Sequence, residues 1–167
     1  VYKGFLYCGL MVGKNGEARV LEYNCRFGDP ETQLLMLLMK GDFLPLLEKA
    51  CREDEFSLSE VSTEFWHQKA GLCVVAAAKG YPGEVRKGDI IEVNSHIEDL
   101  PDIKVFHSGT EILHGNLITN GGRVLTISGI GESKDVLRNV VYKKMSQVKF
   151  DGKHYRNDIG LTEIREK

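Results

Sequence analysis

The sequence predicts an α+β fold, in which a β-hairpin followed by helices packs against a small lobe rich in antiparallel strands. Two strand-like runs flank an Asn-Gly pair near the start of the chain, which is a strong hairpin signal. Beyond about residue 65, short apolar runs alternate with turns rich in Gly and Asn, and one longer helical pattern lies among them. These observations divide the chain into residues 1–55 and residues 56–167.

In the first part, strands are predicted over 4–12 and 17–24, and helices over 31–40, 43–52 and 58–65. The first strand is almost entirely apolar, so we expect it to be largely buried. Asn15 and Gly16 tolerate positive φ and suit the turn between the strands. The first helix begins after Pro30, and Asp42 offers an N-cap to the second helix. A part of this size cannot hold a core alone, so it must pack on the second part or on upstream sequence.

In the second part, strands are predicted over 70–78, 90–93, 104–108, 117–119 and 123–129, a helix over 133–147, and a short strand within 148–160. The helix is indicated by Val136, Val140, Val141 and Met145, which lie at helical spacing, and Ser133 is its predicted N-cap. Gly and Asn residues mark the turns between the strands. The second part is therefore expected to be mostly antiparallel.

The composition is that of an ordinary globular protein, with 42% apolar and 28% charged residues. Twenty-two basic residues against 24 acidic ones leave a net charge of −2, so we expect neither a nucleic-acid-binding face nor a charged tail. The apolar run over 34–39 is too short to span a membrane. The chain begins without Met, which suggests a piece of a longer protein.

The four cysteines are Cys8, Cys25, Cys51 and Cys73, and their spacings match neither a zinc site nor a CxxC redox pair. We predict buried, reduced thiols in a cytoplasmic protein. Cys25 stays open to another interpretation, because it lies in a stretch with many polar groups.

That stretch is VLEYNCRFGDPETQ, residues 20–33. Residues two apart in a strand share a face, so Val20, Glu22 and Asn24 are expected to point the same way. Glu22 and Asn24 then place a carboxylate and an amide oxygen side by side at the strand's end. Two such hard oxygen donors suit Mg²⁺, which takes its remaining ligands from water and phosphate.

The next residues favour an anion site. Arg26 is always charged and can fork onto a phosphate or a carboxylate. Gly28 permits close backbone approach, and Asp29 leads into a helix whose first N–H groups are free. A plainer interpretation is also open: Glu22 and Asn24 form a solvated surface, Arg26 pairs with Asp29, and Asp29 merely caps the helix.

Read whole, GFLYCGLMVGKNGEARVLEYNCRFGDPETQ resembles the end of the ATP-grasp domain in the phosphoribosylamine–glycine ligase (glycinamide ribonucleotide synthetase) family. RFGDPE is that family's signature and appears here without interruption. AAAKGYPGEVRKGDII, KVFHSGT, TNGGRVLTISGIG and YRNDIG resemble the family's carboxy-terminal domain in the same order. The resemblance extends over essentially all 167 residues.

The resemblance implies a ligase of purine biosynthesis. ATP phosphorylates glycine, and the amine of 5-phosphoribosylamine attacks the acyl phosphate. Carried over, Glu22 and Asn24 would bind Mg²⁺ or Mn²⁺, and Arg26 would hold the acyl phosphate or the glycine carboxylate. Gly28 and Asp29 would line the glycine and ribosylamine site.

The phosphate of the ribosylamine needs a cluster of cations. Arg86 and Lys87 are the first candidates and Arg123 the next, although lone surface cations are usually just solvated. His107 is expected to be half-buried or to form a wall of the substrate cleft. Tyr81 could face a ligand, but packing within its turn is the plainer expectation.

Two departures from the family pattern limit the comparison. Many ATP-grasp enzymes supply a further metal carboxylate from the preceding strand, where counting across the turn places Leu10, so the number of metal ions stays open. The first half of the ATP-grasp domain, with its adenine pocket, is absent, so the isolated chain should be inactive. We therefore expect an upstream partner in the same enzyme, and fusion to other purine-pathway domains stays open.

Two other functions stay open. The chain could be a non-catalytic binding module of ATP-grasp ancestry, or part of a different ATP-grasp ligase or carboxylase. A lapsed site would have lost Glu22, Asn24 or Arg26, and all three are present.

Overall fold

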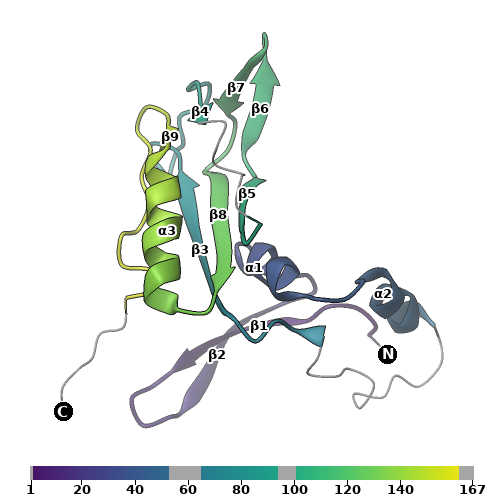
Figure 1. The fold of residues 1–167 in the computed structure, drawn as a ribbon. Helices are drawn as coiled ribbons and strands as arrows, with labels where there is room; N and C mark the ends of the chain where they lie inside the picture. The colour runs from purple at the N-terminus through teal and green to yellow at the C-terminus, as the bar shows by residue number, and fades with distance from the viewer. Residues whose placement is uncertain (1, 53–64, 94–100, 162–167) are drawn as a thin grey trace.

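A computed structural model describes the protein at residues 2–52, 65–93 and 101–161. Its centre is a three-stranded antiparallel sheet with strand order β3-β8-β5 (Figure 1). These strands are β3 (Ala70–Ala77), β8 (Arg123–Gly131) and β5 (Ile103–His107). Helix α3 (Lys134–Ser146) follows β8 and packs against β3 and β8. The α+β prediction is therefore confirmed.

The hydrophobic core lies between this sheet and α3. Leu72 and Val74 of β3 point to the helix, and Val141 and Met145 of α3 are completely buried against them. The buried residues of α3 are spaced by four, which places them on one helical face. Ser133 caps the helix as predicted, since its side chain accepts a hydrogen bond from the backbone N–H of Val136.

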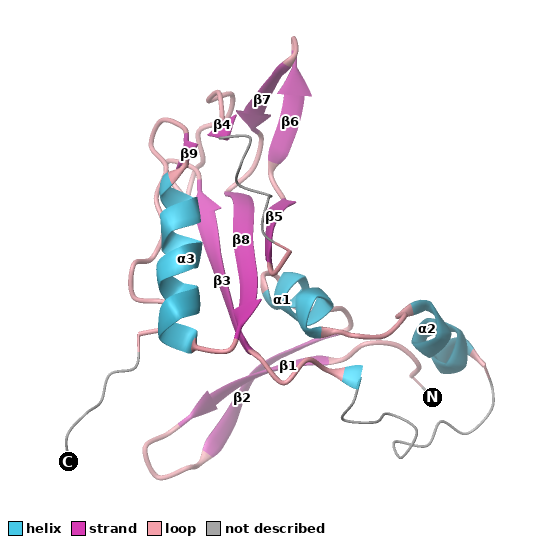
Figure 2. Cartoon of the chain, viewed as in Figure 1, coloured by secondary structure: helices cyan, strands magenta, loops and turns pink. Residues whose placement is uncertain are grey.

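The predicted β-hairpin is present and projects from the body of the molecule (Figure 2). Strand β1 (Tyr7–Val12) pairs with β2 (Ala18–Asn24), and Gly16 has φ +82° in the turn. The expectation that the first strand is largely buried is wrong for the described chain, where Met11 and Val12 are 58% and 62% exposed. Since β1 contacts chiefly β2, its apolar side chains have no described layer to pack on.

Helices α1 (Glu31–Leu38) and α2 (Leu44–Cys51) follow the hairpin, each slightly shorter than predicted. Helix α1 lies on the face of the sheet opposite α3, and the side chain of Leu34 rests directly on Gly71. The chain returns beside the end of α1, where Trp66 forms a bridge with Met39. The helix predicted over 58–65 lies almost wholly outside the described residues.

Two small antiparallel pairs complete the second part. Strand β4 (Glu92–Val93) pairs with β9 (Val148–Lys149), and β6 (Thr110–Leu113) pairs with β7 (Asn116–Thr119). Sequence reasoning missed β6, which follows β5 after only Ser108 and Gly109. Among the described residues, the longest helix has 13 residues, and none combines the length and apolar character needed to cross a membrane.

Gly129 provides a test of the packing between α3 and the sheet. A Cβ at this position would collide with Cδ1 of Ile103 in β5 and would lie 2.9 Å from Leu137 Cδ1 and 3.3 Å from Val141 Cγ2, inside the core. We expect Gly129→Ala to lower the free energy of unfolding by about 1–3 kcal/mol through overpacking. Urea unfolding measures this change.

Gly131→Ala is the matched control, because its Cβ would meet Leu137 only at ordinary contact distance, 3.7 Å. The control should change stability by less than about 0.5 kcal/mol. Equal effects of the two substitutions would contradict the close approach of α3 at Gly129.

Candidate functional site

The loop between β2 and α1 is tied to the second part of the chain through Asp29. Arg123, the first residue of β8, places its Nε 3.2 Å from Asp29 Oδ2 and donates from Nη1 to the Asp29 carbonyl oxygen at 2.9 Å. Gln33 of α1 donates to Asp29 Oδ1 at 3.0 Å. Asp29 therefore contacts the Arg123 guanidinium with both its side chain and its backbone.

These contacts rule out the plainer interpretation of Asp29. Its ion-pair partner is Arg123, not Arg26, and α1 begins after Pro30 without a side-chain cap. Arg26 donates to the carbonyl oxygen of its neighbour Phe27 at 2.8 Å and is exposed. Among the described residues, the Arg26 guanidinium has this one hydrogen bond, so its other N–H groups can bind another partner.

Gly28 lies where the loop is most crowded. A Cβ there would come within 2.9 Å of the Tyr7 ring and would collide with the carboxylate of Glu31. The Gly28 carbonyl oxygen accepts hydrogen bonds from the backbone and the hydroxyl of Thr32. Phe27, next to it, stacks on Phe5 with ring centroids 3.9 Å apart. The loop is thus fixed on both sides of Gly28.

Glu22 and Asn24 share a face of β2, as predicted, because the pairing with β1 is regular from Glu22 to Asn24. The register shifts just before them, so Leu21 is an extra residue and Leu10 lies opposite Val20. The expectation that Leu10 faces Glu22 is wrong: Gly9 does. The bulge also interrupts the alternation of faces along β2, so the expectation that Val20 shares a face with Glu22 and Asn24 no longer follows.

The pair fits a hydrated divalent cation. The Glu22 side chain is exposed, whereas the Nδ2 atom of Asn24 is buried without a hydrogen-bond partner among the described residues. No group of three His, Cys, Asp or Glu side chains suited to a metal occurs in the described part of the chain. A carboxylate oxygen and an amide oxygen are the kind of ligand that Mg²⁺ takes in proteins, alongside several waters.

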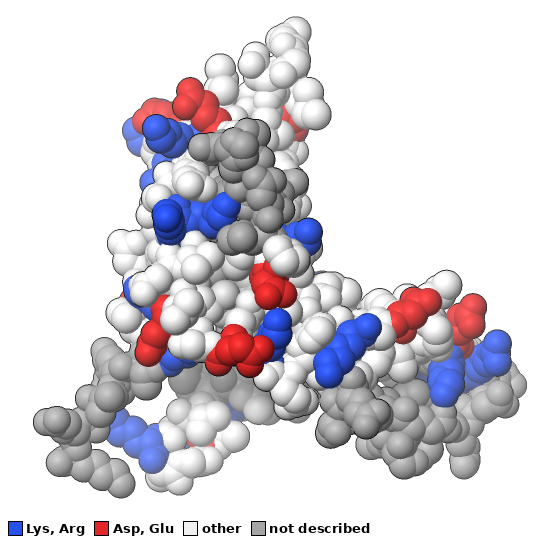
Figure 3. All heavy atoms as spheres, viewed as in Figure 1, with Lys and Arg blue, Asp and Glu red and all other residues white. Residues whose placement is uncertain are grey.

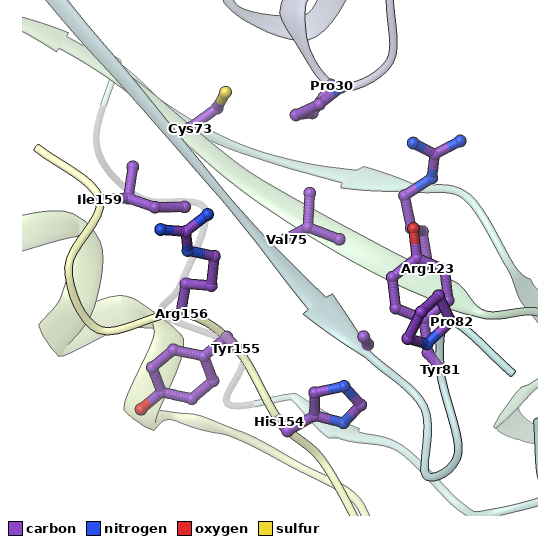
Figure 4. Close-up of a pocket in the computed structure, with 11 residues that line it drawn as sticks. Pro30, Cys73, Val75, Tyr81, Pro82, Arg123, His154, Tyr155, Arg156 and Ile159 are labelled. Carbon is purple, nitrogen blue, oxygen red and sulfur yellow. The ribbon is translucent and has the colours of Figure 1, made fainter.

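A cavity of about 420 Å³ opens beside Asp29 and Arg123 (Figure 4). Its floor is the face of β3 opposite α3, and its walls are Pro30, the Tyr81-Pro82 turn and the carboxy-terminal tail. The cations that line it are Arg123, Arg156 and, when protonated, His154. None of its described lining residues is a carboxylate. The cavity therefore has a largely apolar lining with two arginines, each of which is also paired with a carboxylate outside the lining, Asp29 for Arg123 and Asp158 for Arg156.

Tyr81 packs against the residue that precedes β8 and also lines the cavity. Its ring lies so close to Gly122 that a Cβ there would be 2.6 Å from Tyr81 Cδ2, and the same side chain lines the cavity. The Gly122 carbonyl oxygen accepts a hydrogen bond from the Ala78 N–H at 2.9 Å. This contact sets the Tyr81-Pro82 turn beside the start of β8, where Arg123 lies.

The other predicted phosphate ligands lie elsewhere. Arg86 forms an ion pair with Asp89 at 2.7 Å and another with Asp151, and its hydrogen bond holds the pKa of Asp151 below the usual value. Lys87 is exposed in the following turn. Neither Arg86 nor Lys87 is among the described residues that line the cavity. His107 is exposed and lies 3.1 Å from the Thr110 hydroxyl, also away from the cavity lining.

Comparison with known proteins shows which family the chain resembles. A family described as phosphoribosylglycinamide synthetase, C domain, matches residues 71–162, which is more than half of the chain. A second, described as phosphoribosylglycinamide synthetase, ATP-grasp (A) domain, matches residues 1–32. The chain belongs to the phosphoribosylglycinamide synthetase family. The signature loop, residues 26–31, lies in the first matched region, and the cavity is lined by Pro30 from that region and by residues of the second.

Individual relatives carry the same description. The phosphoribosylamine–glycine ligase of Synechocystis is 47% identical over 95% of the chain, and that of Haemophilus influenzae is 44% identical over 98%. The crystal structure of the Thermotoga maritima phosphoribosylamine–glycine ligase superimposes with a TM-score of 0.73, at 35% identity over 92% of the chain. The chain spans 36–37% of the length of these synthetase relatives.

Sequence reasoning did not predict that the carboxy-terminal segment, residues 154–160, lines the cavity. His154, Tyr155 and Arg156 line it, yet YRNDIG was used only as a family resemblance. The available signal was a His and an Arg two residues apart beside a Tyr. Local sequence could not show that this segment lies against β3.

The cysteines differ from their prediction in exposure but not in oxidation state. All four are free thiols, but Cys8, Cys25 and Cys51 are exposed. Cys73 lies half-buried on β3 and lines the cavity. Burial raises the pKa of the Cys73 thiol to about 11, and the nearby carboxylates of Glu31 and Asp29 contribute in the same direction.

Cys73 should therefore resist alkylation. With a pKa of about 11, roughly one thiol in a thousand is ionised at pH 8, and only the thiolate reacts. We expect iodoacetamide to label Cys73 at least about tenfold more slowly than Cys51, as measured by peptide mass spectrometry. The difference should disappear in denaturant, and equal rates in the folded protein would contradict the assigned surroundings of Cys73.

The Asp29–Arg123 contact should stabilise the fold measurably. Both side chains are partly exposed, at 37% and 41%, so a double-mutant cycle of Asp29→Ala and Arg123→Ala should give a coupling of about 1 kcal/mol. The more exposed Arg19–Glu17 pair, 3.5 Å apart, is the control, and its coupling should be below about 0.5 kcal/mol. Urea unfolding of the four variants in each cycle gives these values. A coupling no larger than that of the control would show that the contact does not join the two parts.

Proposed function

We propose that the chain is the carboxy-terminal part of an ATP-dependent carbon–nitrogen ligase. The enzyme joins glycine to 5-phosphoribosylamine through a glycyl phosphate and forms glycinamide ribonucleotide in purine biosynthesis. The observation that carries this proposal is the Asp29–Arg123 contact, which brings the signature loop to a cavity lined by cations and no described carboxylate. The ligase name of the relatives supports it.

The nucleotide end of the reaction lies at the hairpin. Glu22 and Asn24 would hold Mg²⁺ or Mn²⁺, and the bound ion would neutralise charge on the transferring phosphoryl group. Arg26, whose donors are mostly free, would hold the glycine carboxylate or the acyl phosphate. The crowded backbone at Gly28 would keep the glycine in place and exclude water from the acyl phosphate.

The ribosylamine end lies in the cavity. Asp29 lines the approach to it and aims Arg123, whose remaining N–H groups would bind the ribosyl phosphate. We assign the phosphate to Arg123 in preference to Arg86 or Lys87, because Arg123 is among the described residues that line the cavity and the other two are not. The amine of the sugar would then point toward the signature loop, where the acyl phosphate forms.

The remaining parts of the proposal concern the intact protein. The adenine pocket would come from sequence upstream, which would also cover the exposed apolar residues of β1 and β2. The division between the ATP-grasp part and the carboxy-terminal domain would fall near residue 55. Four free thiols support a reducing compartment, for which we propose the cytoplasm. Fusion to other purine-pathway domains is a further proposal that sequencing upstream would test.

The test is glycine-dependent release of ADP from ATP with 5-phosphoribosylamine, using the intact protein that carries this chain. We expect Glu22→Gln to lower kcat by at least about a hundredfold, because it removes a charged metal ligand. The free energy of unfolding should change by less than about 1 kcal/mol, because the Glu22 side chain is exposed.

Glu17→Gln is the matched control, since it removes an exposed carboxylate from the same hairpin. The control should keep nearly full activity. A folded but inactive wild-type protein would sink the ligase proposal and favour a binding module or a different ATP-grasp substrate. Unfolding of Glu22→Gln would make Glu22 a structural residue.

A further inference from the structure

The tail from residue 154 to residue 160 is an added wall along the free edge of β3. The backbone of His154 exchanges two hydrogen bonds with Ala77, at 2.8 and 3.1 Å. At the other end, Gly160 approaches Leu72 so closely that a Cβ there would lie 2.7 Å from Leu72 Cδ1. The segment between them is therefore held in line with β3 and beside the cavity.

Helix α3 holds the backbone of this wall at Arg156 and at the residues that follow it. The Tyr142 hydroxyl donates to the Arg156 carbonyl oxygen at 2.7 Å, and Arg138 Nε donates to the Ile159 carbonyl oxygen at 3.2 Å. Arg138 also donates to the Asn157 carbonyl oxygen and lies over the Tyr142 ring. These contacts hold the main chain and leave the Arg156 side chain to the cavity.

The Arg156 guanidinium has an exchangeable partner. It binds Asp158, two residues along the chain, through Nε at 3.0 Å and Nη2 at 2.6 Å. The two side chains are 76% and 57% exposed, and such surface pairs contribute little free energy. A phosphate with two charged oxygens could therefore replace or share this carboxylate at small cost.

Arg156 and Arg123 lie on either side of the cavity floor. Figure 4 shows Arg156 beside Ile159 and Arg123 near the Tyr81 ring, with Val75 between the two arginines. A single guanidinium already shared with Asp29 leaves a phosphate dianion incompletely neutralised. Apolar side chains on the floor would contact a sugar ring, and a cavity of about 420 Å³ is large enough for a sugar phosphate.

We propose that Arg156 is a second cation for the phosphate monoester of the substrate and binds it together with Arg123. This inference rests on the proposed function, because it names a ligand of the ribosylamine site. It assigns the tail a part in substrate binding, beyond its packing on β3. The competing explanation is that Arg156 serves only to pair with Asp158 on the surface.

The test compares Arg156→Gln and Asp158→Asn in the intact protein. Losing a charged hydrogen-bond donor to phosphate should raise the KM for 5-phosphoribosylamine about 10–100-fold in Arg156→Gln. The KM values for glycine and ATP should stay within about twofold, because neither substrate contacts this wall. Asp158→Asn should leave the ribosylamine KM unchanged or lower it, and Arg156→Lys should fall between wild type and Arg156→Gln.

An unchanged ribosylamine KM in Arg156→Gln would overturn the inference. An equal rise of the ribosylamine KM in Arg156→Gln and Asp158→Asn would also overturn it, because the KM would then depend on the Arg156–Asp158 ion pair and not on a contact between Arg156 and phosphate. Circular dichroism checks that each variant is folded. If Arg156→Gln does not fold, the ribosylamine KM of Arg156→Lys tests the inference instead.

Failure of the ligase proposal is a separate outcome, seen as an inactive wild-type protein. Calorimetric titration with ribose 5-phosphate then tests the phosphate site by itself. If wild type binds ribose 5-phosphate, affinity should fall at least about tenfold in Arg156→Gln and stay unchanged in Asp158→Asn. That result would support the phosphate site even though the ligase proposal had failed. Equal binding to wild type and Arg156→Gln, or none to either, would overturn it.

Discussion

The contact between Asp29 and Arg123 is the constraint on which the geometry of the site depends. It joins a loop near the start of the chain to the first residue of β8, 94 positions later. Asp29 uses its carboxylate and its carbonyl oxygen on one guanidinium, so the orientation of Arg123 is set as well as its position. The cavity exists beside this junction because Pro30 closes one wall and the Tyr81-Pro82 turn, seated on Gly122, closes another.

The stability of the chain is distributed unevenly around this junction. The buried core lies between the β3-β8-β5 sheet and α3, whereas α1 and α2 contain no fully buried residue. The β1-β2 hairpin exposes more apolar side chains than is usual on the surface of a soluble domain. The chain spans 36–37% of the length of its relatives, and this exposed hairpin carries the proposed metal ligands. The second part thus holds the buried core and most of the cavity lining, whereas the hairpin carries the proposed metal ligands on an exposed element.

Positive and negative side chains are mixed on the surface of the molecule (Figure 3). On the face shown in Figure 3, Lys and Arg side chains are interspersed with Asp and Glu, and neither forms a continuous patch over the described residues. The cavity differs from this pattern, since its described lining contains two arginines and no carboxylate. A nearly neutral protein can therefore present a site for a small anion. Arg86, by contrast, lies outside this lining and pairs with Asp89 and Asp151.

The sequence by itself determined the local elements: Asn15-Gly16 made the hairpin, Ser133 began α3, and strand alternation placed Glu22 and Asn24 on one face. Each depends on neighbours within a few residues, so periodicity and turn chemistry suffice to predict it. Only the tertiary structure decided that Arg123 lines the cavity while Arg86 does not, and that His154 and Arg156 line it too. It also revealed the bulge that puts Gly9, not Leu10, opposite Glu22. These features arise from contacts between distant segments, and the local pattern of a segment does not specify which partner it meets.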